Sequence, residues 1–212
     1  MSLKERLDAE CRKMPPAIRE AWEDLVSHLS VAGALRRVLK VGDRMPDFVL
    51  PYAEGQLVTS DALYDRAPLV LTFFRGEWCP YCSLVLDALE GALPDIAAAG
   101  GHVVALSPEI GGRALTVKEN QRLNFEILCD VDNGVALAFG VAFRVPEAYR
   151  LAILREGIDL NERHGNDGWF IPIPASFIVD TAGTIRGVFA DPDFTRRAEP
   201  DDIIACLKDL RQ

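Results

Sequence analysis

The sequence lacks the features that mark several classes of protein. Its 212 residues carry a net charge of −9, so there is no basic excess to bind nucleic acid or an anionic membrane surface. No uninterrupted apolar run reaches the roughly 18 residues of a membrane-spanning helix. The opening segment, MSLKERLDAE, has no apolar core of a secretory signal. We therefore expect a cytoplasmic protein without nucleic-acid or membrane partners.

Cysteine and histidine are also scarce. The five cysteines are odd in number and mostly far apart, unlike the framework of a small disulfide-rich secreted domain. The three histidines are isolated from one another and from the cysteines. The chain contains neither a GxGxxG fingerprint nor a P-loop, so we predict no metal, flavin or nucleotide cofactor.

The most informative stretch of the chain is LVLTFFRGEWCPYCSLVLDAL at residues 69–89. It opens with an apolar run rich in strand formers, of the kind that a sheet buries on both faces. A glycine ends that run, and after Cys79-Pro80-Tyr81-Cys82 the apolar residues return at helical spacing. Two cysteines three positions apart at a strand-to-helix junction are typical of a redox dithiol.

The position of the two cysteines favours thiolate chemistry. Pro80 suits the first position of a helix, where its missing N–H costs nothing. Cys79 would then face the free backbone donors and the positive end of the helix dipole, which lower a cysteine pKa. Cys82 follows at i+3 on the same side of the first turn, within reach of a disulfide. We expect Cys79 to be the more exposed, attacking thiol and Cys82 to be its deeper, resolving partner.

Two other interpretations of the cysteine pair stay open from the residues alone. Zinc ribbons also use CxxC, but no second CxxC or histidine pair follows in this chain. The pair could also be two unrelated buried thiols, because free cysteine is among the most buried residue types. The same argument predicts structural roles for the remaining cysteines, Cys11, Cys129 and Cys206.

The chain divides into an N-terminal helical extension (1–40) and one α/β domain (41–212). Within that domain, strands and helices alternate and a hairpin follows, which predicts a mixed central sheet flanked by helices. Residues 144–172 break this rhythm and are predicted to be an insertion. The extension should lie outside the core around the dithiol. It is either a packing element or a dimer surface, and we favour packing because a Trp/Leu stripe is more often core.

Three segments together resemble a known family. VGDRMPDFVL, FFRGEWCPYC and IPIPASFIVDTAGTIRG are similar to the alkyl hydroperoxide reductase/thiol-specific antioxidant family, the peroxiredoxin-like branch of the thioredoxin fold. The resemblance covers about residues 41–212 and implies a thioredoxin-like α/β fold. It also implies an antioxidant oxidoreductase that reduces hydroperoxides or disulfides and is regenerated by a thioredoxin- or glutathione-type reductant.

The chain departs from that family at the catalytic positions. Peroxiredoxins carry Pro-x-x-x-Thr-x-x-Cys with the peroxide-attacking cysteine last, and in this register that cysteine falls on Cys82. The threonine falls on Cys79, the proline on Arg75, and the arginine that precedes the late strand falls on Pro174. In thioredoxins the last of these positions holds the cis-proline that faces the dithiol. We therefore expect Pro174 to be cis and opposite the two sulfurs.

Roles are also predicted for residues around the two cysteines. Arg75 is predicted to polarise the peroxide and hold the thiolate, and the alternative is an ion pair with Glu77 at the rim. Trp78 is predicted to cover the sulfurs, and Tyr81 completes the tetrad that glutaredoxins carry. His164 is expected to be solvated rather than catalytic.

The sequence supports three functions. The first is hydroperoxide reduction by a Cys79–Cys82 dithiol/disulfide cycle. The second is reduction of protein disulfides without peroxidase activity. The third is a non-catalytic redox sensor in which the disulfide changes the pose of residues 144–172 or of the N-terminal extension.

Overall fold

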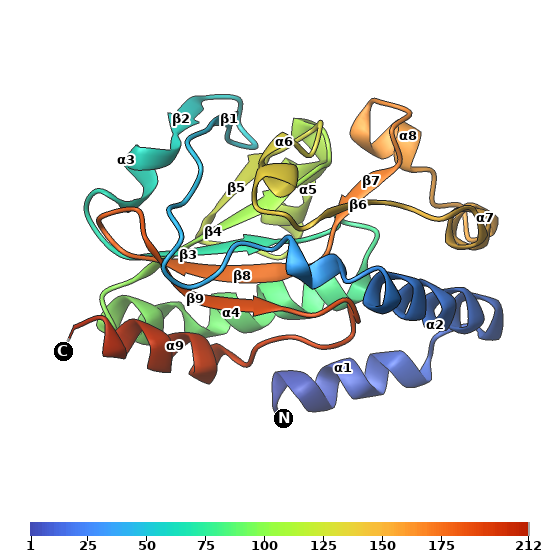
Figure 1. Cartoon of the computed structure of the whole chain (residues 1–212), viewed down its shortest axis with the longest axis horizontal. Coiled ribbons are helices and arrows are strands. Elements are labelled where there is room, and N and C mark those ends of the chain that lie inside the picture. Colours follow the sequence, from blue (N-terminus) through green and yellow to red (C-terminus); the bar gives the residue numbers. More distant parts are fainter. Residues whose placement is uncertain (212) are drawn as a thin grey trace.

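The computed structural model describes residues 1–211 and is built around a five-stranded mixed sheet (Figure 1). The strands lie in the order β5-β4-β3-β8-β9, with β3, β4 and β5 parallel and β8 and β9 antiparallel to their neighbours. Their bounds are β3 Leu69–Phe73, β4 His102–Ser107, β5 Glu126–Cys129, β8 Ala175–Val179 and β9 Ile185–Ala190. This is the predicted mixed sheet, with the strand before the dithiol at its centre.

Helices cover both faces of the sheet, as the alternation of strands and helices predicts. The helices are α1 Leu3–Arg12, α2 Pro16–Val31, α3 Ser60–Tyr64, α4 Pro80–Ala98, α5 Gly111–Asn120, α6 Gly134–Ala138, α7 Glu147–Arg155, α8 Leu160–His164 and α9 Pro200–Asp209, with a 3₁₀ turn η1 at Ala34–Arg36. None of the helices in residues 1–211 is long and apolar enough to cross a membrane.

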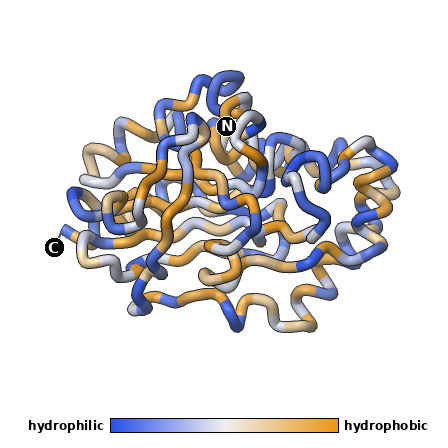
Figure 2. Tube along the Cα trace, turned by 90° about the horizontal axis from the view of Figure 1, so that it is seen from above, coloured by the Kyte–Doolittle hydropathy of each residue, from blue (hydrophilic) through white to orange (hydrophobic). Residues whose placement is uncertain are grey.

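Every residue of β3 is buried, and its side chains alternate between two cores. Leu69, Leu71 and Phe73 face the core under α3 and α6, where Phe73 packs against Phe139 with ring centroids 5.1 Å apart. Val70 faces the second core under α4 and α9. Figure 2 shows the hydrophobic strands at the centre and the hydrophilic segments at the periphery. Burial on both faces explains the unbroken apolar run in the sequence.

The N-terminal extension belongs to the core that contains the dithiol. Helix α1 packs on α4 and α2 packs on α7, and Leu3, Leu7 and Leu25 are buried in the same cluster as Cys79 and Cys82. The expectation that this extension lies outside the core is therefore wrong. Its apolar stripes complete the face of the sheet that carries the site.

Two short hairpins complete the fold. Strands β1 Val49–Pro51 and β2 Leu57–Thr59 pair in the first. In the second, β6 Ala142–Arg144 pairs with β7 Phe170–Pro172, and the chain between them forms α7 and α8 (Figure 1). This hairpin places α7 against α2, close to the N-terminal end of α4.

Candidate active site

The dithiol lies where β3 gives way to α4. Gly76 makes the turn with φ of +132°, a backbone conformation that side chains other than glycine rarely adopt. Cys79 is then the extended N-cap of α4, and Pro80 occupies the first helical position, as predicted. The backbone N–H groups of Cys82 and Ser83 donate to the Cys79 carbonyl at 3.0 and 3.2 Å and fix the first turn.

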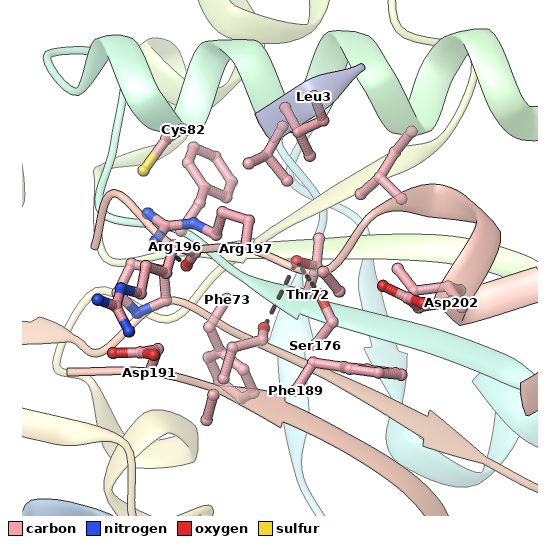
Figure 3. A pocket seen from close by; sticks show the side chains of 18 of the residues that line it. Leu3, Thr72, Phe73, Cys82, Ser176, Phe189, Asp191, Arg196, Arg197 and Asp202 are labelled. Carbon is pink, nitrogen blue, oxygen red and sulfur yellow. Dashed lines mark hydrogen bonds between the residues drawn. The ribbon is translucent and has the colours of Figure 1, made fainter. Parts of the chain in front are cut away.

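Both sulfur-bearing residues are buried, which corrects the expected difference in exposure. Cys79 is 0% exposed and Cys82 is 1% exposed. Cys82, rather than Cys79, lines a cavity of about 360 Å³ (Figure 3). The sequence places Cys79 at a helix tip, but side chains from distant segments cover that tip.

Arg75 contacts both cysteines. Its Nη2 donates to Cys79 Sγ at 3.1 Å, and its backbone N–H donates to Cys82 Sγ at 3.4 Å. Its Nη1 donates to the Tyr149 hydroxyl at 3.2 Å. The predicted alternative, an Arg75–Glu77 ion pair, does not form, because Glu77 lies instead 3.6 Å from Arg163.

Aromatic side chains enclose the Arg75 guanidinium. Its Cζ lies 3.7 Å from the ring centroid of Phe194 and 4.7 Å from that of Trp78. The indole N–H of Trp78 donates to the Arg75 carbonyl at 3.0 Å. Tyr81 packs edge-on against Phe194 with centroids 5.2 Å apart. The cation is therefore buried under rings on the side of Cys79.

The two thiols differ in acidity because of these neighbours. Burial alone would raise the pKa of Cys79, but the Cys82 thiol and the guanidinium groups of Arg75 and Arg197 outweigh it and hold the pKa well below its usual range. Burial and the neighbouring Cys79 sulfur raise the pKa of Cys82 well above its usual range. Of the two thiols, Cys79 is therefore the more acidic and Cys82 the less acidic.

Arg197 is a second cation at the dithiol and was not predicted. It lies in the loop between β9 and α9 and lines the cavity at Cys82 together with Arg196 (Figure 3). Its charge lowers the pKa of both cysteines. The pair Arg196-Arg197 stands in an otherwise acidic segment, DPDFTRRAEP, and that contrast was the available signal. Nothing in the sequence around Phe194 or Tyr149 indicated that these residues lie at the site.

Pro174 lines the cavity at Cys82 but is not cis. Within residues 1–211 no peptide bond is cis, so the predicted cis-proline is wrong. Ala175, the next residue, pairs with Phe73 in the sheet, and this pairing holds the proline near the dithiol end of β3.

A buried carboxylate supports the loop before the dithiol. Glu109 is 0% exposed, and its side chain accepts the backbone N–H of Glu77 at 2.6 Å and lies 3.3 Å from Arg163 Nη1. A Cβ at Gly76 would lie 2.5 Å from its carboxyl carbon. Burial raises the pKa of Glu109 despite these donors. The sequence analysis did not identify this residue.

The remaining candidates lie away from the sulfurs. His164 is buried rather than solvated, its Nε2 has no partner in the described part of the chain, and burial together with Arg163 lowers its pKa to about 4. Cys129 is buried and its pKa is raised to about 11 by burial. Cys11 and Cys206 are half-buried.

A second, apolar pocket of about 180 Å³ opens on the Arg75 side of the dithiol. The N-terminal extension, α7 and the tetrad together form it, and its lining includes Met14, Arg75, Trp78, Pro80 and Ile153. The dithiol thus lies between two pockets, and the one on the Arg75 side has the more apolar surface although Glu10, Lys13 and Glu156 also line it.

Two cysteines on the first turn of a helix, at the end of the central strand of a mixed sheet of this order, define a thioredoxin-like fold. Residues 41–188 match the AhpC/TSA family, so the chain belongs to that family. The resemblance seen in the sequence is thereby confirmed.

Individual relatives agree with this assignment. The chain is 27% identical over 171 residues to peroxiredoxin Bcp of Escherichia coli (strain K12), covering 81% of this chain and 97% of that protein. It is 33% identical over 102 residues to a putative peroxiredoxin of Mycobacterium tuberculosis (strain CDC 1551 / Oshkosh), covering 48% of this chain and 64% of that protein. The crystal structure of peroxidoxin BcpB from M. tuberculosis shares the fold, with a TM-score of 0.64 and 22% identity over 82% of this chain and 99% of that one.

Proposed function

We propose that the protein reduces hydroperoxides through a Cys79–Cys82 dithiol/disulfide cycle. The observation that carries the proposal is the 3.1 Å contact between Arg75 Nη2 and Cys79 Sγ. It pairs a thiolate with a charged donor that is also able to polarise an O–O bond. Family membership and the peroxiredoxin relatives support the same activity.

In the proposed reaction the Cys79 thiolate attacks one oxygen of the hydroperoxide. The O–O bond breaks, an alcohol or water leaves with a proton, and Cys79 becomes a sulfenic acid. The Cys82 sulfur then attacks Cys79, water is lost, and an intramolecular disulfide forms. Arg75 stabilises the thiolate and the developing negative charge on oxygen. The apolar pocket beside Trp78 and Pro80 would hold the organic part of a hydroperoxide.

The burial of Cys79 favours this function over reduction of protein disulfides. A protein disulfide must approach the attacking sulfur directly, and Cys79 has no exposed surface. A small peroxide needs only a narrow path between side chains. The cytoplasmic location stays a prediction, and a dimer surface on the N-terminal extension stays the untested alternative to packing.

Stopped-flow oxidation by hydrogen peroxide and by an organic hydroperoxide tests the proposal. We expect Cys79 to react far faster than free cysteine, and Cys79→Ser to abolish the reaction. In Cys82→Ser the sulfenic acid should accumulate on Cys79 and be detectable by mass spectrometry. A rate equal to that of free cysteine would contradict the proposed peroxidase. A sulfenic acid that forms in Cys79→Ser and not in Cys82→Ser would reverse the order of the two thiols.

A further inference from the structure

The cavity at Cys82 is a built pocket with a charged end. Arg196, Arg197 and Asp191 lie at the same end as the Cys82 sulfur, and Asp202 lies at the opposite end (Figure 3). Its volume of about 360 Å³ falls in the range of small-ligand sites. The apolar floor comes from side chains of β3, β9 and α4, and it is separate from the apolar pocket beside Trp78.

The cavity lining carries two arginines and two aspartates, but the two arginines differ in their partners. Arg196 is paired with Asp193, its Nε lying 3.4 Å from the carboxylate, and Asp191 accepts the backbone N–H of Asp193. Arg197 has no carboxylate within ion-pair distance in the described chain, and its Nη1 donates only to the Arg196 carbonyl at 2.9 Å. Its buried Nη2 has no hydrogen-bond partner of good geometry among residues 1–211, and the guanidinium interacts with the Cys82 thiol. A buried guanidinium nitrogen left in this state favours an anionic ligand.

Oxidation of the dithiol changes what these arginines face. In the reduced protein Arg75 donates to Cys79 Sγ at 3.1 Å, where a thiolate would offset one cationic charge. A Cys79–Cys82 disulfide carries no charge, so neither Arg75 nor Arg197 then has a negatively charged sulfur beside it. An anion that enters the cavity is therefore most favoured in the state that has to be reduced.

We propose that this cavity admits the reductant, a small thiol that carries a carboxylate, and that this thiol attacks Cys82 while Arg197 binds the carboxylate. The inference rests on the proposed dithiol cycle and specifies its reductant. Glutathione belongs to the required chemical class. Asp202, at the far end, accepts the backbone N–H of Glu199 at 3.3 Å as part of the N-terminal cap of α9, so the Arg197 cation at the Cys82 end is the group that selects the ligand.

The exchange step balances in charge and electrons. The reductant thiolate attacks Cys82 Sγ, a new S–S bond forms, and the Cys79–Cys82 bond breaks. Cys79 leaves as a thiolate beside Arg75, and the thiol of lower pKa is the better leaving group. A second thiolate attacks the reductant sulfur of the mixed disulfide and releases the oxidised reductant. Cys82 leaves in that step and takes up a proton.

The test measures reduction of protein that was oxidised by diamide, so it does not depend on peroxidase activity. Rates with 3-mercaptopropionate (anionic), 2-mercaptoethanol (neutral) and cysteamine (cationic) are compared, each corrected for its thiolate concentration. We expect the anionic thiol to exceed the neutral one by about tenfold. Arg197→Gln should bring this ratio close to one, and Arg197→Lys should keep part of it. Arg66→Gln, which removes the same charge from an exposed side chain outside the cavity, should keep all of it.

A second arm identifies the attacked sulfur. Diamide-oxidised wild type is mixed with glutathione, the reaction is quenched early with iodoacetamide, and mass spectrometry locates the mixed disulfide. We expect glutathione on Cys82 and the alkyl group on Cys79. The proposal is overturned if glutathione is found only on Cys79, or if wild type is reduced at the same rate by anionic, neutral and cationic thiols. It is also overturned if Arg197→Gln keeps the preference for the anionic thiol. The proposal would also be overturned if thioredoxin reduced wild type and Arg197→Gln at equal rates while the charge of a small thiol had no effect on its rate.

Discussion

An arginine lies on each side of the dithiol, and the surroundings of the two arginines are opposite in character. On the Cys79 side, the Arg75 guanidinium is enclosed by Phe194 and Trp78, and Cys79 has no exposed surface. On the Cys82 side, the Arg197 guanidinium faces a cavity, and its Nη2 has no hydrogen-bond partner within residues 1–211. The comparison teaches that Arg75, which is enclosed by side chains, is suited to stabilise a thiolate. Arg197 faces a cavity and is therefore accessible to a ligand.

The difference arises from the segments that cover each side. The N-terminal extension and α7 close the Cys79 side, where Tyr149 of α7 binds Arg75. The Cys82 side opens into the cavity between α4, strand β9 and α9, to which α1 contributes Leu3. The asymmetry of the dithiol is thus set by elements far from it in the sequence.

Replacing Arg75 should have the largest effect on the difference between the two sides of the dithiol. Arg75→Gln removes the charged donor to Cys79 while the Arg197 side is kept, and we expect the rate of peroxide reduction at pH 7 to fall by about 100-fold. The pKa of Cys79 should rise, so the increasing limb of the pH–rate profile should move to higher pH. The loss should therefore be largest at low pH and shrink as pH approaches the ordinary thiol pKa. Stopped-flow rates between pH 5 and 9 check this, and an unshifted profile would remove Arg75 from the mechanism.

Replacing Gly76 should disturb the turn that both sides share. Gly76→Ala places a side chain at φ of +132° and against the Glu109 carboxylate, so we expect a loss of about 2 kcal/mol in the free energy of unfolding. Displacement of the loop should also slow Cys79 oxidation by about tenfold. Chemical denaturation and stopped-flow kinetics measure the two effects. Gly112→Ala is the matched control, since a Cβ there meets no atom within 4 Å. Equal effects of the two substitutions would contradict this account.

Replacing Tyr149 should give the smallest effect and sharpen the comparison. Tyr149→Phe removes only the hydroxyl that accepts from Arg75 Nη1, so we expect Cys79 oxidation to slow by about threefold. The preference of the disulfide for anionic thiols should stay unchanged, because it depends on Arg197. Peroxide and thiol rates on one preparation test both statements. A lost thiol preference would show that the two sides are coupled.

The local chemistry of the site could be predicted from the sequence, because it depends on residues close together in the chain. The strand before Gly76, the helix that begins at Pro80 and the placement of the two cysteines on its first turn all follow from the pattern at 69–89. Arg75 was also identified, since only three residues separate it from Cys79. The mixed character of the sheet followed from the alternation of strands and helices with a hairpin near the end, whereas the order of the strands was not predicted.

Residues brought in from distant segments could not be predicted in this way. Phe194 and Arg197 lie more than a hundred positions from the dithiol, and nothing in their own neighbourhood specifies which helix they approach. His164 stands in a polar segment that suggests solvent, yet it is buried. Pro174 matches the thioredoxin cis-proline by spacing, but its peptide bond is trans.

The sequence alone determined that two thiols share the first turn of a helix at the end of a buried strand, because strand, turn and helix preferences are local. Only the tertiary structure decided which thiol is enclosed and which meets a cavity. That choice depends on how α7, the N-terminal helices and the loop after β9 pack around α4. Packing of this kind is set by the shape and burial of the whole core, and no single stretch of residues contains it.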